Sequence, residues 1–266
     1  MSTAKNYLEL NKKLWNDKVD FHLQSDFYDM DGFYNGRNSL MDIEMSYLKS
    51  VAGKTILHLQ CHFGQDTISL SKLGATVTGV DFSEKAIQAA KAIATKLQTD
   101  TRFLCCDIYD LPNHLDEPFD IVFTSYGTIG WLPDLDKWAK VISKFLKPDG
   151  QLIFVEFHPV VWMFDYDFKS VAYDYFNTEA IIETTEGTYA DKSAPIKNTN
   201  VNWNHPTSEV INSLVQNGLC IERFDEYDYS PYNCFNGMVE FEPQKFRIAS
   251  LAKKFPMVFA LIARKK

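Results

Sequence analysis

The stretch Thr55-Ile-Leu-His-Leu-Gln-Cys-His-Phe-Gly-Gln-Asp66 decides the fold class of this chain. Its opening apolar run, 55–59, ends at a polar turn, as expected of a buried parallel strand. Residues 66–73 then place apolar side chains at helical spacing and stop at Gly74, a typical helix C-cap. A second run, rich in β-branched residues, ends at Asp81. Strand, helix and strand in this order predict a βαβ unit.

The same alternation continues along the chain. Ser83 is a helix N-cap followed by apolar residues three and four apart, and Lys147-Pro-Asp-Gly150 is a turn before a fifth strand. We expect further strands at 102–106, 119–124, 151–156, 219–227 and 256–264, and further helices at 135–146 and 207–217. Together these elements predict an α/β, doubly wound, mostly parallel sheet of seven strands with helices on both faces.

Two segments do not follow the alternation. Residues 1–50 predict an N-terminal helical cap, with helices at about 4–18 and 38–50 around an aromatic loop at 27–34. Within the main domain, 51–266, an insertion at about 159–204 is too long for a plain connection and carries alternating patches typical of hairpins. We interpret this insertion as a β-rich lid. Its many aromatic residues, and those of the cap, either close over a ligand pocket or form small cores of their own.

Composition excludes several classes of protein. The formal net charge is −8, from 27 Lys+Arg and 35 Asp+Glu, and the basic residues are scattered, so no nucleic-acid partner is expected. Apolar runs such as 257–263 are much shorter than the roughly 20 residues of a membrane helix, and no secretory signal is visible. The 5 cysteines lack CxxC spacing and are typical of free thiols. We therefore expect a cytoplasmic protein without a membrane partner; the sequence leaves the oligomeric state open.

The carboxyl ends of the predicted strands should form the ligand site, because an open parallel sheet binds ligands there. Asp81 ends the second strand, close to the roughly 20 residues past the first turn at which an acid binds a ribose diol. A carboxylate accepts hydrogen bonds from both ribose hydroxyls. The structural alternative is that Asp81 caps the helix that begins after Ser83. We expect the ribose role.

The first turn discriminates between nucleotide cofactors. A dinucleotide site needs several glycines for close approach of a diphosphate, whereas this turn has only Gly64, with bulky Gln60 and His62 beside it. Asp66 would also repel a diphosphate. A nicotinamide-dependent oxidoreductase is therefore disfavoured, and the turn favours S-adenosylmethionine (SAM), a nucleoside that carries a small zwitterion.

At this point the chain resembles the class I SAM-dependent methyltransferases, a Rossmann-like family, over roughly residues 52–158. The resemblance rests on five pieces in order: 56–67, 77–83, 103–112, 119–124 and 145–152. The first motif departs from the family pattern, since His58 stands in place of an acid and Gln60 and His62 replace two glycines. It is similar to the HLQCHFGQDT-type motif of a bacterial branch of the family.

The resemblance implies a set of cofactor contacts. Asp81 would bind the ribose hydroxyls, and Phe82 would pack on the adenine, unless it is ordinary core. Asp107 would accept from the adenine amino group, unless it only forms a turn. The remaining expected contacts are the backbone amide of Ile108 to the adenine ring, Gln60, Cys61 and Gly64 along the methionine arm, and the backbone of Ser125 near the sulfonium.

The sequence indicates the catalytic residues less clearly than the cofactor contacts, because methyl transfer from a sulfonium needs positioning more than a strong base. His158, after the fifth strand and beside Glu156, is the first candidate for a general base; the alternative is a loop histidine bound to backbone. Tyr126 is the second candidate. It stands where relatives that methylate amide or amino nitrogen carry Asn-Pro-Pro-Tyr, and the absence of that motif argues against DNA bases or glutamine as acceptors.

No metal is expected, since a strand and its loop do not bring His58 and His62 together with Cys61 as ligands. The sequence thus predicts a methyltransferase with a small-molecule acceptor. The alternative is a catalytically silent SAM-binding sensor or partner protein, motivated by the altered first motif.

Overall fold

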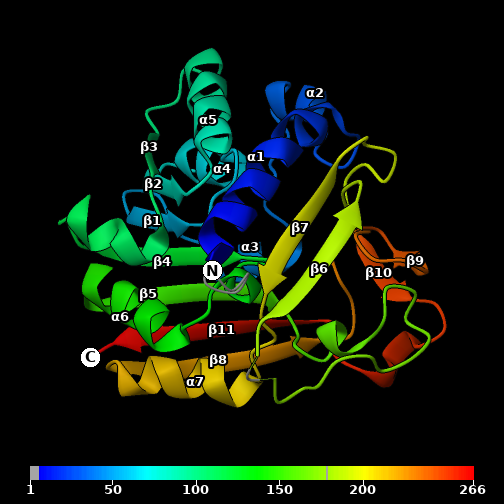
Figure 1. Ribbon diagram of the computed structural model, residues 1–266. Coiled ribbons are helices and arrows are strands. Elements are labelled where there is room, and N and C mark those ends of the chain that lie inside the picture. The colour runs from blue at the N-terminus through cyan, green and yellow to red at the C-terminus, as the bar shows by residue number, and fades with distance from the viewer. Residues whose placement is uncertain (1–5, 178) are drawn as a thin grey trace.

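The computed structural model describes residues 6–177 and 179–266, and its centre is one seven-stranded sheet (Figure 1). The strand order is β3-β2-β1-β4-β5-β11-β8, and β11 runs antiparallel to both of its neighbours. The strands are β1 (Thr55–Leu59), β2 (Thr76–Asp81), β3 (Arg102–Cys105), β4 (Phe119–Ser125), β5 (Leu146–Phe157), β8 (Leu219–Tyr227) and β11 (Val258–Lys265). The predicted mostly parallel, seven-stranded Rossmann-like sheet is confirmed.

Helices cover both faces of this sheet. They are α4 (Gln65–Lys72), α5 (Glu84–Lys96), α6 (Leu135–Phe145) and α7 (Thr207–Gln216). The strands contribute side chains to the hydrophobic cores on both faces of the sheet. In β1, Leu57 packs in the core that contains α6 and α7, whereas its neighbour Ile56 packs with Leu70 of α4 in another core. Buried strands of this kind are apolar on both faces, which explains their continuous hydrophobic runs.

The start of β5 differs from the prediction. Residues 147–150 were expected to form a turn before a strand at 151, but β5 begins at Leu146 and includes them. Pairing with β4 shifts register between Phe119 and Ile121, and Asp149 has a φ of 61°. The turn is therefore accommodated as an irregularity within the strand.

The N-terminal segment forms α1 (Tyr7–Gln24), α2 (Met30–Tyr34) and α3 (Asp42–Tyr47). Compared with the expectation, α1 is longer, α3 is shorter, and α2 lies in the predicted aromatic loop; residues 4 and 5 of the expected first helix lie outside the described part. Asn16 fixes α1 against α5, because its Oδ1 accepts from Oγ of Ser83 at 2.7 Å. Ser83 in turn caps α5 by accepting from the amide of Ala86, as predicted.

The insertion contains the expected antiparallel hairpin, β6 (Ile181–Glu186) with β7 (Lys197–Asn202). Asn11 of α1 binds this hairpin through both groups of its amide, at 2.7 Å and 2.9 Å from the backbone of Val201. The α1 helix therefore lies between α5 and the lid (Figure 1). A second hairpin, β9 (Met238–Glu242) with β10 (Lys245–Ile248), follows β8 and precedes β11 in the sequence and was not predicted.

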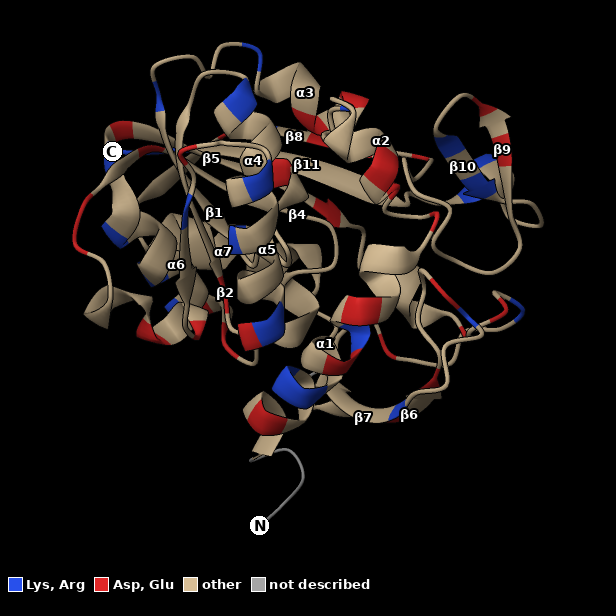
Figure 2. Ribbon diagram, turned by 90° about the horizontal axis from the view of Figure 1, so that it is seen from above, with Lys and Arg blue, Asp and Glu red and all other residues tan. Residues whose placement is uncertain are grey.

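Charged residues of both signs are interspersed along the helices and hairpins (Figure 2). One example is the contact of α1 with α5, where Lys85 pairs with Asp20 at 3.1 Å. No helix among the described residues combines the length and the apolar character that a bilayer crossing requires.

Candidate cofactor and active site

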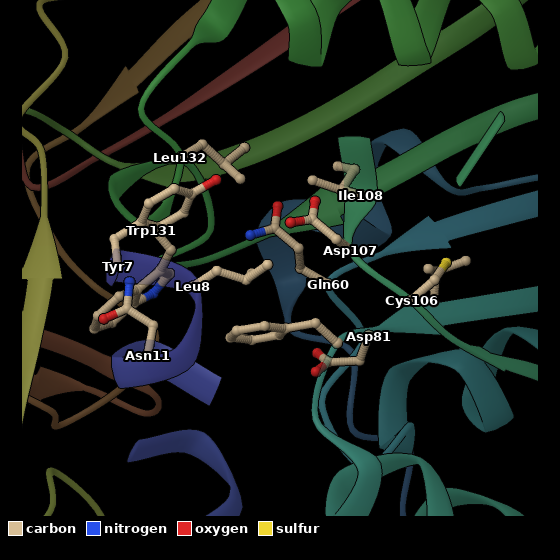
Figure 3. Close-up of a pocket in the computed structure, with 12 residues that line it drawn as sticks. Tyr7, Leu8, Asn11, Gln60, Asp81, Cys106, Asp107, Ile108, Trp131 and Leu132 are labelled. Atoms are coloured by element: carbon tan, nitrogen blue, oxygen red, sulfur yellow. The ribbon is translucent and has the colours of Figure 1, made fainter. Parts of the chain in front are cut away.

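A pocket of about 440 Å³, part of it open to solvent, lies at the carboxyl ends of β1, β2 and β3. Its lining residues are Tyr7, Leu8, Asn11, Gln60, Val80, Asp81, Phe82, Cys106, Asp107, Ile108, Trp131 and Leu132. In Figure 3 the α1 side chains form one wall, Asp81, Cys106 and Asp107 form the opposite wall, and Gln60 lies between them.

The Asp81 carboxylate is held in place by two backbone amides. Its Oδ2 accepts from the amide of His62 at 2.8 Å, and its Oδ1 accepts from the amide of Ser83 at 2.9 Å. Burial raises the pKa of Asp81 to about 6. Each oxygen has a second lone pair, so the cap contact and a contact with a ribose hydroxyl are compatible.

Asp107 likewise combines a turn with a place on the pocket wall. It caps a short 3₁₀ helix, Ile108–Asn113, by accepting from the amide of Tyr109 at 2.7 Å. Tyr7 of α1 lies nearby, since burial and then the charge of Asp107 raise the pKa of Tyr7 to about 12. The part of the pocket where adenine is expected, at Asp107 and Ile108, is therefore lined on the opposite side by α1.

In the first turn, two non-glycine residues and one glycine adopt a backbone conformation that normally favours glycine. Gln60, His62 and Gly64 have φ values of 54°, 51° and 77°, all in the left-handed region. Only Gly64 is also required by space, because a Cβ there would lie 2.6 Å from the ring of Phe103. Gln60 is anchored by its Nε2, which donates to the carbonyl of Thr128 at 2.9 Å, while its buried Oε1 has no partner. Gln60 and His62, which replace two glycines of the family motif, thus adopt a backbone conformation that favours glycine.

Three polar side chains beside this turn, Lys18, His22 and His62, have few or no polar contacts, and no motif in the sequence singles out Lys18. Lys18 of α1 is only 8% exposed and pairs with no carboxylate among the described residues; its Nζ lies 4.6 Å from the ring centroid of Trp15. His22 has no partner for either ring nitrogen, and His62 has none for its Nε2. Burial lowers the pKa of Lys18 to about 8 and that of His62 to about 3.

These orphaned groups test whether SAM fits the pocket. The ammonium of Lys18 lies against the rings of Trp15, Trp131 and Tyr189 and can still pair with an anion. The only anion of SAM is the carboxylate at the end of its methionine arm. The two pocket acids, Asp81 and Asp107, would face the neutral hydroxyl and amino donors of adenosine. The residues present therefore fit SAM, with the adenosine end at β2 and β3 and the carboxylate end at α1.

Cys61, Gly64 and Ser125, three predicted contacts, do not line this pocket. Cys61 is buried in a core cluster with Phe103, and its Sγ would lie 2.9 Å from a Cβ at Gly79. Their proposed roles at the methionine arm stay predictions. Gln60, Asp81, Phe82, Asp107 and Ile108 do line it, as expected.

The two catalytic candidates have structural partners. His158 is not on the pocket wall: its Nε2 lies 3.0 Å from Oε1 of Glu226, and its Nδ1 accepts from the amide of Val160 at 3.3 Å. This is close to the loop-histidine alternative, and burial lowers the pKa of His158. Tyr126, with a φ of 49°, donates from its hydroxyl to Oε2 of Glu44 at 2.7 Å.

Glu156, which flanks His158 in the sequence, organises the loop after β4. Its buried carboxylate accepts from the amides of Gly127, Thr128 at 2.7 Å and Ile129 at 3.3 Å, and from the Thr128 hydroxyl at 3.0 Å. The same loop accepts the Gln60 side chain and carries Trp131 into the pocket. Glu156 therefore positions one wall of the site.

The class of domain follows from this geometry together with a family comparison. Residues 56–150 match the family described as "Methyltransferase domain". These residues hold β1 to the start of β5 and include the first turn, Asp81 and Asp107. Over these residues the chain is therefore similar to a methyltransferase domain, and its sheet has the fold of the SAM-dependent methyltransferases, a class of enzymes whose cofactor is SAM. The predicted domain class and cofactor are confirmed.

Individual relatives match only part of this chain and do not identify its methyl acceptor. A ubiquinone biosynthesis O-methyltransferase from Coxiella burnetii is 30% identical over 135 residues, 50% of this chain and 57% of the relative. A demethylmenaquinone methyltransferase from Lactobacillus johnsonii is 36% identical over 114 residues, 41% of this chain and 46% of the relative. A solved SAM-dependent methyltransferase from Clostridium acetobutylicum has a TM-score of 0.57 at 16% identity and covers 94% of this chain and 95% of that one. The chain spans about half the length of the curated relatives it matches.

Proposed function

We propose that this protein transfers a methyl group from SAM to a small-molecule acceptor. The observation that carries the proposal is the placement of Asp81 and Asp107 on one pocket wall, with the unpaired Lys18 beside the same first turn. Acids at the nucleoside end and a cation at the amino-acid end complement the charge distribution of SAM.

The residues of this chain would bind the cofactor in three parts. Asp81 would accept from the ribose hydroxyls, Asp107 and the amide of Ile108 would bind the adenine edge, and Lys18 would pair with the carboxylate. SAM supplies the reaction with a methyl carbon already activated by positive sulfur. The protein then needs chiefly to orient the acceptor and exclude water.

The enclosure of the site supports a small acceptor. The lid contributes Tyr189, whose ring lies 4.8 Å from that of His22 and 5.6 Å from Nζ of Lys18. Tyr28 of the N-terminal segment bonds to Tyr189 through the two hydroxyls. A site closed by two such segments favours a molecule that can be surrounded over a polymer that passes through. Two relatives are named for ubiquinone biosynthesis and for demethylmenaquinone, and such quinones are small molecules.

Gln60 and His62, whose presence motivated the alternative of a catalytically silent SAM-binding protein, adopt the left-handed backbone conformation that favours glycine, which supports close approach of a cofactor to this turn. Calorimetry with SAM and S-adenosylhomocysteine tests the proposal. We expect both to bind in one-to-one stoichiometry, and labelled SAM incubated with a metabolite extract to yield one labelled small molecule. Failure of both nucleosides to bind would contradict the proposal; binding without any transfer would revive the sensor alternative.

A further inference from the structure

The α1 helix belongs to two parts of the molecule at once. Its residues Tyr7, Leu8 and Asn11 line the cofactor pocket (Figure 3). The same helix also packs against strand β7 of the lid (Figure 1). Asn11 takes part in both contacts, because it lines the pocket and also binds the backbone of β7. It is therefore a residue through which binding in the pocket can affect the position of the lid.

Asn11 binds the lid through its whole side-chain amide. Its Nδ2 donates to the carbonyl of Val201 at 2.7 Å, and its Oδ1 accepts from the amide of Val201 at 2.9 Å. Asn11 is 1% exposed and Val201 is 0% exposed, so water does not compete for these two hydrogen bonds. Two bonds to the backbone of one residue fix the orientation of β7 relative to α1 as well as the distance between them.

The β6–β7 hairpin has little support of its own. It forms a separate two-stranded sheet, and β6 has no buried side chain. The buried side chains of β7 are Asn198, Asn200 and Val201. A two-stranded hairpin alone is only marginally stable in water. The position of the lid therefore depends on the elements that β7 contacts, which include α1 and the loop after β4.

This loop provides a second connection between the lid and the pocket. The amide of Trp203, one residue past β7, donates to the carbonyl of Gly130 at 2.8 Å, and the residue after Gly130 is Trp131, which lines the pocket. The ring of Trp203 also meets the ring of Tyr7 edge-on at 5.3 Å. The end of β7 thus contacts two elements that line the cofactor pocket.

A bound cofactor would strengthen the docking of α1. The helix is held against α5 by polar contacts, in which Asn16 binds Ser83 at 2.7 Å and Glu84 at 3.1 Å. On the pocket side, Leu8 is 37% exposed. A nucleoside in the pocket would cover Leu8 and contact Tyr7, and burial of apolar surface is favourable. The docked position of α1 should therefore be more stable when the cofactor is present.

We infer that Asn11 is a positioning residue that makes closure of the lid depend on the bound cofactor. This role rests on the proposed methyl transfer and gives it an order. SAM binds first and stabilises the docked α1, and β7 follows α1 through its two bonds to Asn11. The methyl acceptor then meets a closed site only when the methyl donor is present, and closure excludes water from the reacting groups.

Hydrogen exchange measures closure without requiring the acceptor. The backbone amides of residues 181–202 are followed in the free protein and with saturating S-adenosylhomocysteine, whose binding is measured by calorimetry. We expect S-adenosylhomocysteine to slow their exchange at least fivefold. Unchanged exchange in a protein that binds S-adenosylhomocysteine overturns the coupling and leaves the methyltransferase proposal intact. Absence of binding contradicts the proposed function and the coupling together.

The variant Asn11→Ala tests whether the response passes through this residue. Exchange of the hairpin should become faster in the free protein and respond less than twofold to S-adenosylhomocysteine. If Asn11 only supported the lid, exchange would be faster but the fivefold response would remain, which would overturn the coupling. Lys13→Met is the matched control. Lys13 donates to Oδ1 of Asn198 on β7 at 3.0 Å but is exposed and does not line the pocket, so this variant should keep the full response.

Cofactor affinity gives a second measurement. Because coupling between two sites is reciprocal, Asn11→Ala can weaken S-adenosylhomocysteine binding at most by the factor by which this nucleoside slows exchange of the lid. A larger loss would place Asn11 in the cofactor site itself and overturn the positioning role. If the hairpin of Asn11→Ala exchanges like a free peptide, Asn11→Asp takes its place. This variant keeps the bond from the amide of Val201 and should at least halve the response, whereas a full response overturns the coupling.

Discussion

The amide of His62 donates to Oδ2 of Asp81 at 2.8 Å and so ties the first turn to the end of β2. The residue that replaces a family glycine therefore orients the acid expected to bind the ribose. Because Oδ1 of the same carboxylate is held by Ser83 at 2.9 Å, the acid is fixed before any ligand arrives. Preorganisation of this kind reduces the entropic cost of binding.

Removing this carboxylate should weaken cofactor binding. We expect Asp81→Ala to weaken the binding of S-adenosylhomocysteine by about 1–3 kcal/mol, the range for leaving buried hydrogen-bonding groups without their partner. Calorimetry measures the loss, with circular dichroism to verify folding. Asp116→Ala, an exposed change, is the control. An unchanged affinity in a folded Asp81→Ala protein would mean that the nucleoside binds elsewhere.

The affinity for S-adenosylhomocysteine should depend on pH at both ends of the neutral range. Asp81, whose pKa is raised to about 6, loses its charge as the pH falls through that value and then accepts ribose hydroxyls less well. Lys18, whose pKa is lowered to about 8, loses its charge as the pH rises through that value and no longer pairs with the carboxylate. Titrations across this range should give an optimum between the two, and Lys18→Met should abolish the alkaline limb. An alkaline limb that persists in Lys18→Met would rule out this role for Lys18.

Because Gln60 has a left-handed backbone conformation, a glycine at position 60 should give a more stable protein than an alanine, the reverse of the usual order in a helix. Gln60→Gly and Gln60→Ala both remove the bond to Thr128, but alanine at a φ of 54° carries a steric penalty of about 1–2 kcal/mol that glycine avoids. We therefore expect the glycine variant to be more stable than the alanine variant in chemical denaturation. Ala92→Gly, in the middle of α5, should instead destabilise by roughly 0.5–1 kcal/mol. If alanine proves equal to glycine at position 60, the turn does not have this conformation.

Glu156 should prove structural and not catalytic. Glu156→Gln turns an amide NH₂ toward the backbone amides of Gly127 to Ile129, which can only donate. We expect a loss of about 2–3 kcal/mol in the free energy of unfolding and faster hydrogen exchange over 127–131. Glu240→Gln, an exposed change on β9, serves as the comparison. Wild-type exchange in that loop would contradict the assigned role.

The sheet could be predicted from sequence because its strands are buried on both faces and its helices present regular apolar stripes. The β9–β10 hairpin was missed because β9 has no buried side chain and β10 buries only Ile248, so little core pattern marks it. The start of β5 was misplaced because Lys147-Pro-Asp-Gly150 has the composition of a turn, and only pairing with β4 shows that the strand continues through it.

The site was predictable where it depends on strand ends. Asp81, Asp107 and Gln60 follow directly from the rule that ligands bind at the carboxyl edge. Lys18 and Tyr7 did not, because their contribution depends on how α1 docks against α5 and the lid. The spacing of Tyr7, Asn11 and Lys18 on one face of α1 was the available signal, but it does not indicate what that face meets.

The most direct test of the central claim is a crystal structure of this protein with S-adenosylhomocysteine. The account predicts the ribose hydroxyls on Asp81, the adenine amino group at Asp107, and the amino-acid carboxylate within bonding distance of Nζ of Lys18. A nucleoside found in any other cavity, or one oriented with its carboxylate toward β3, would contradict it.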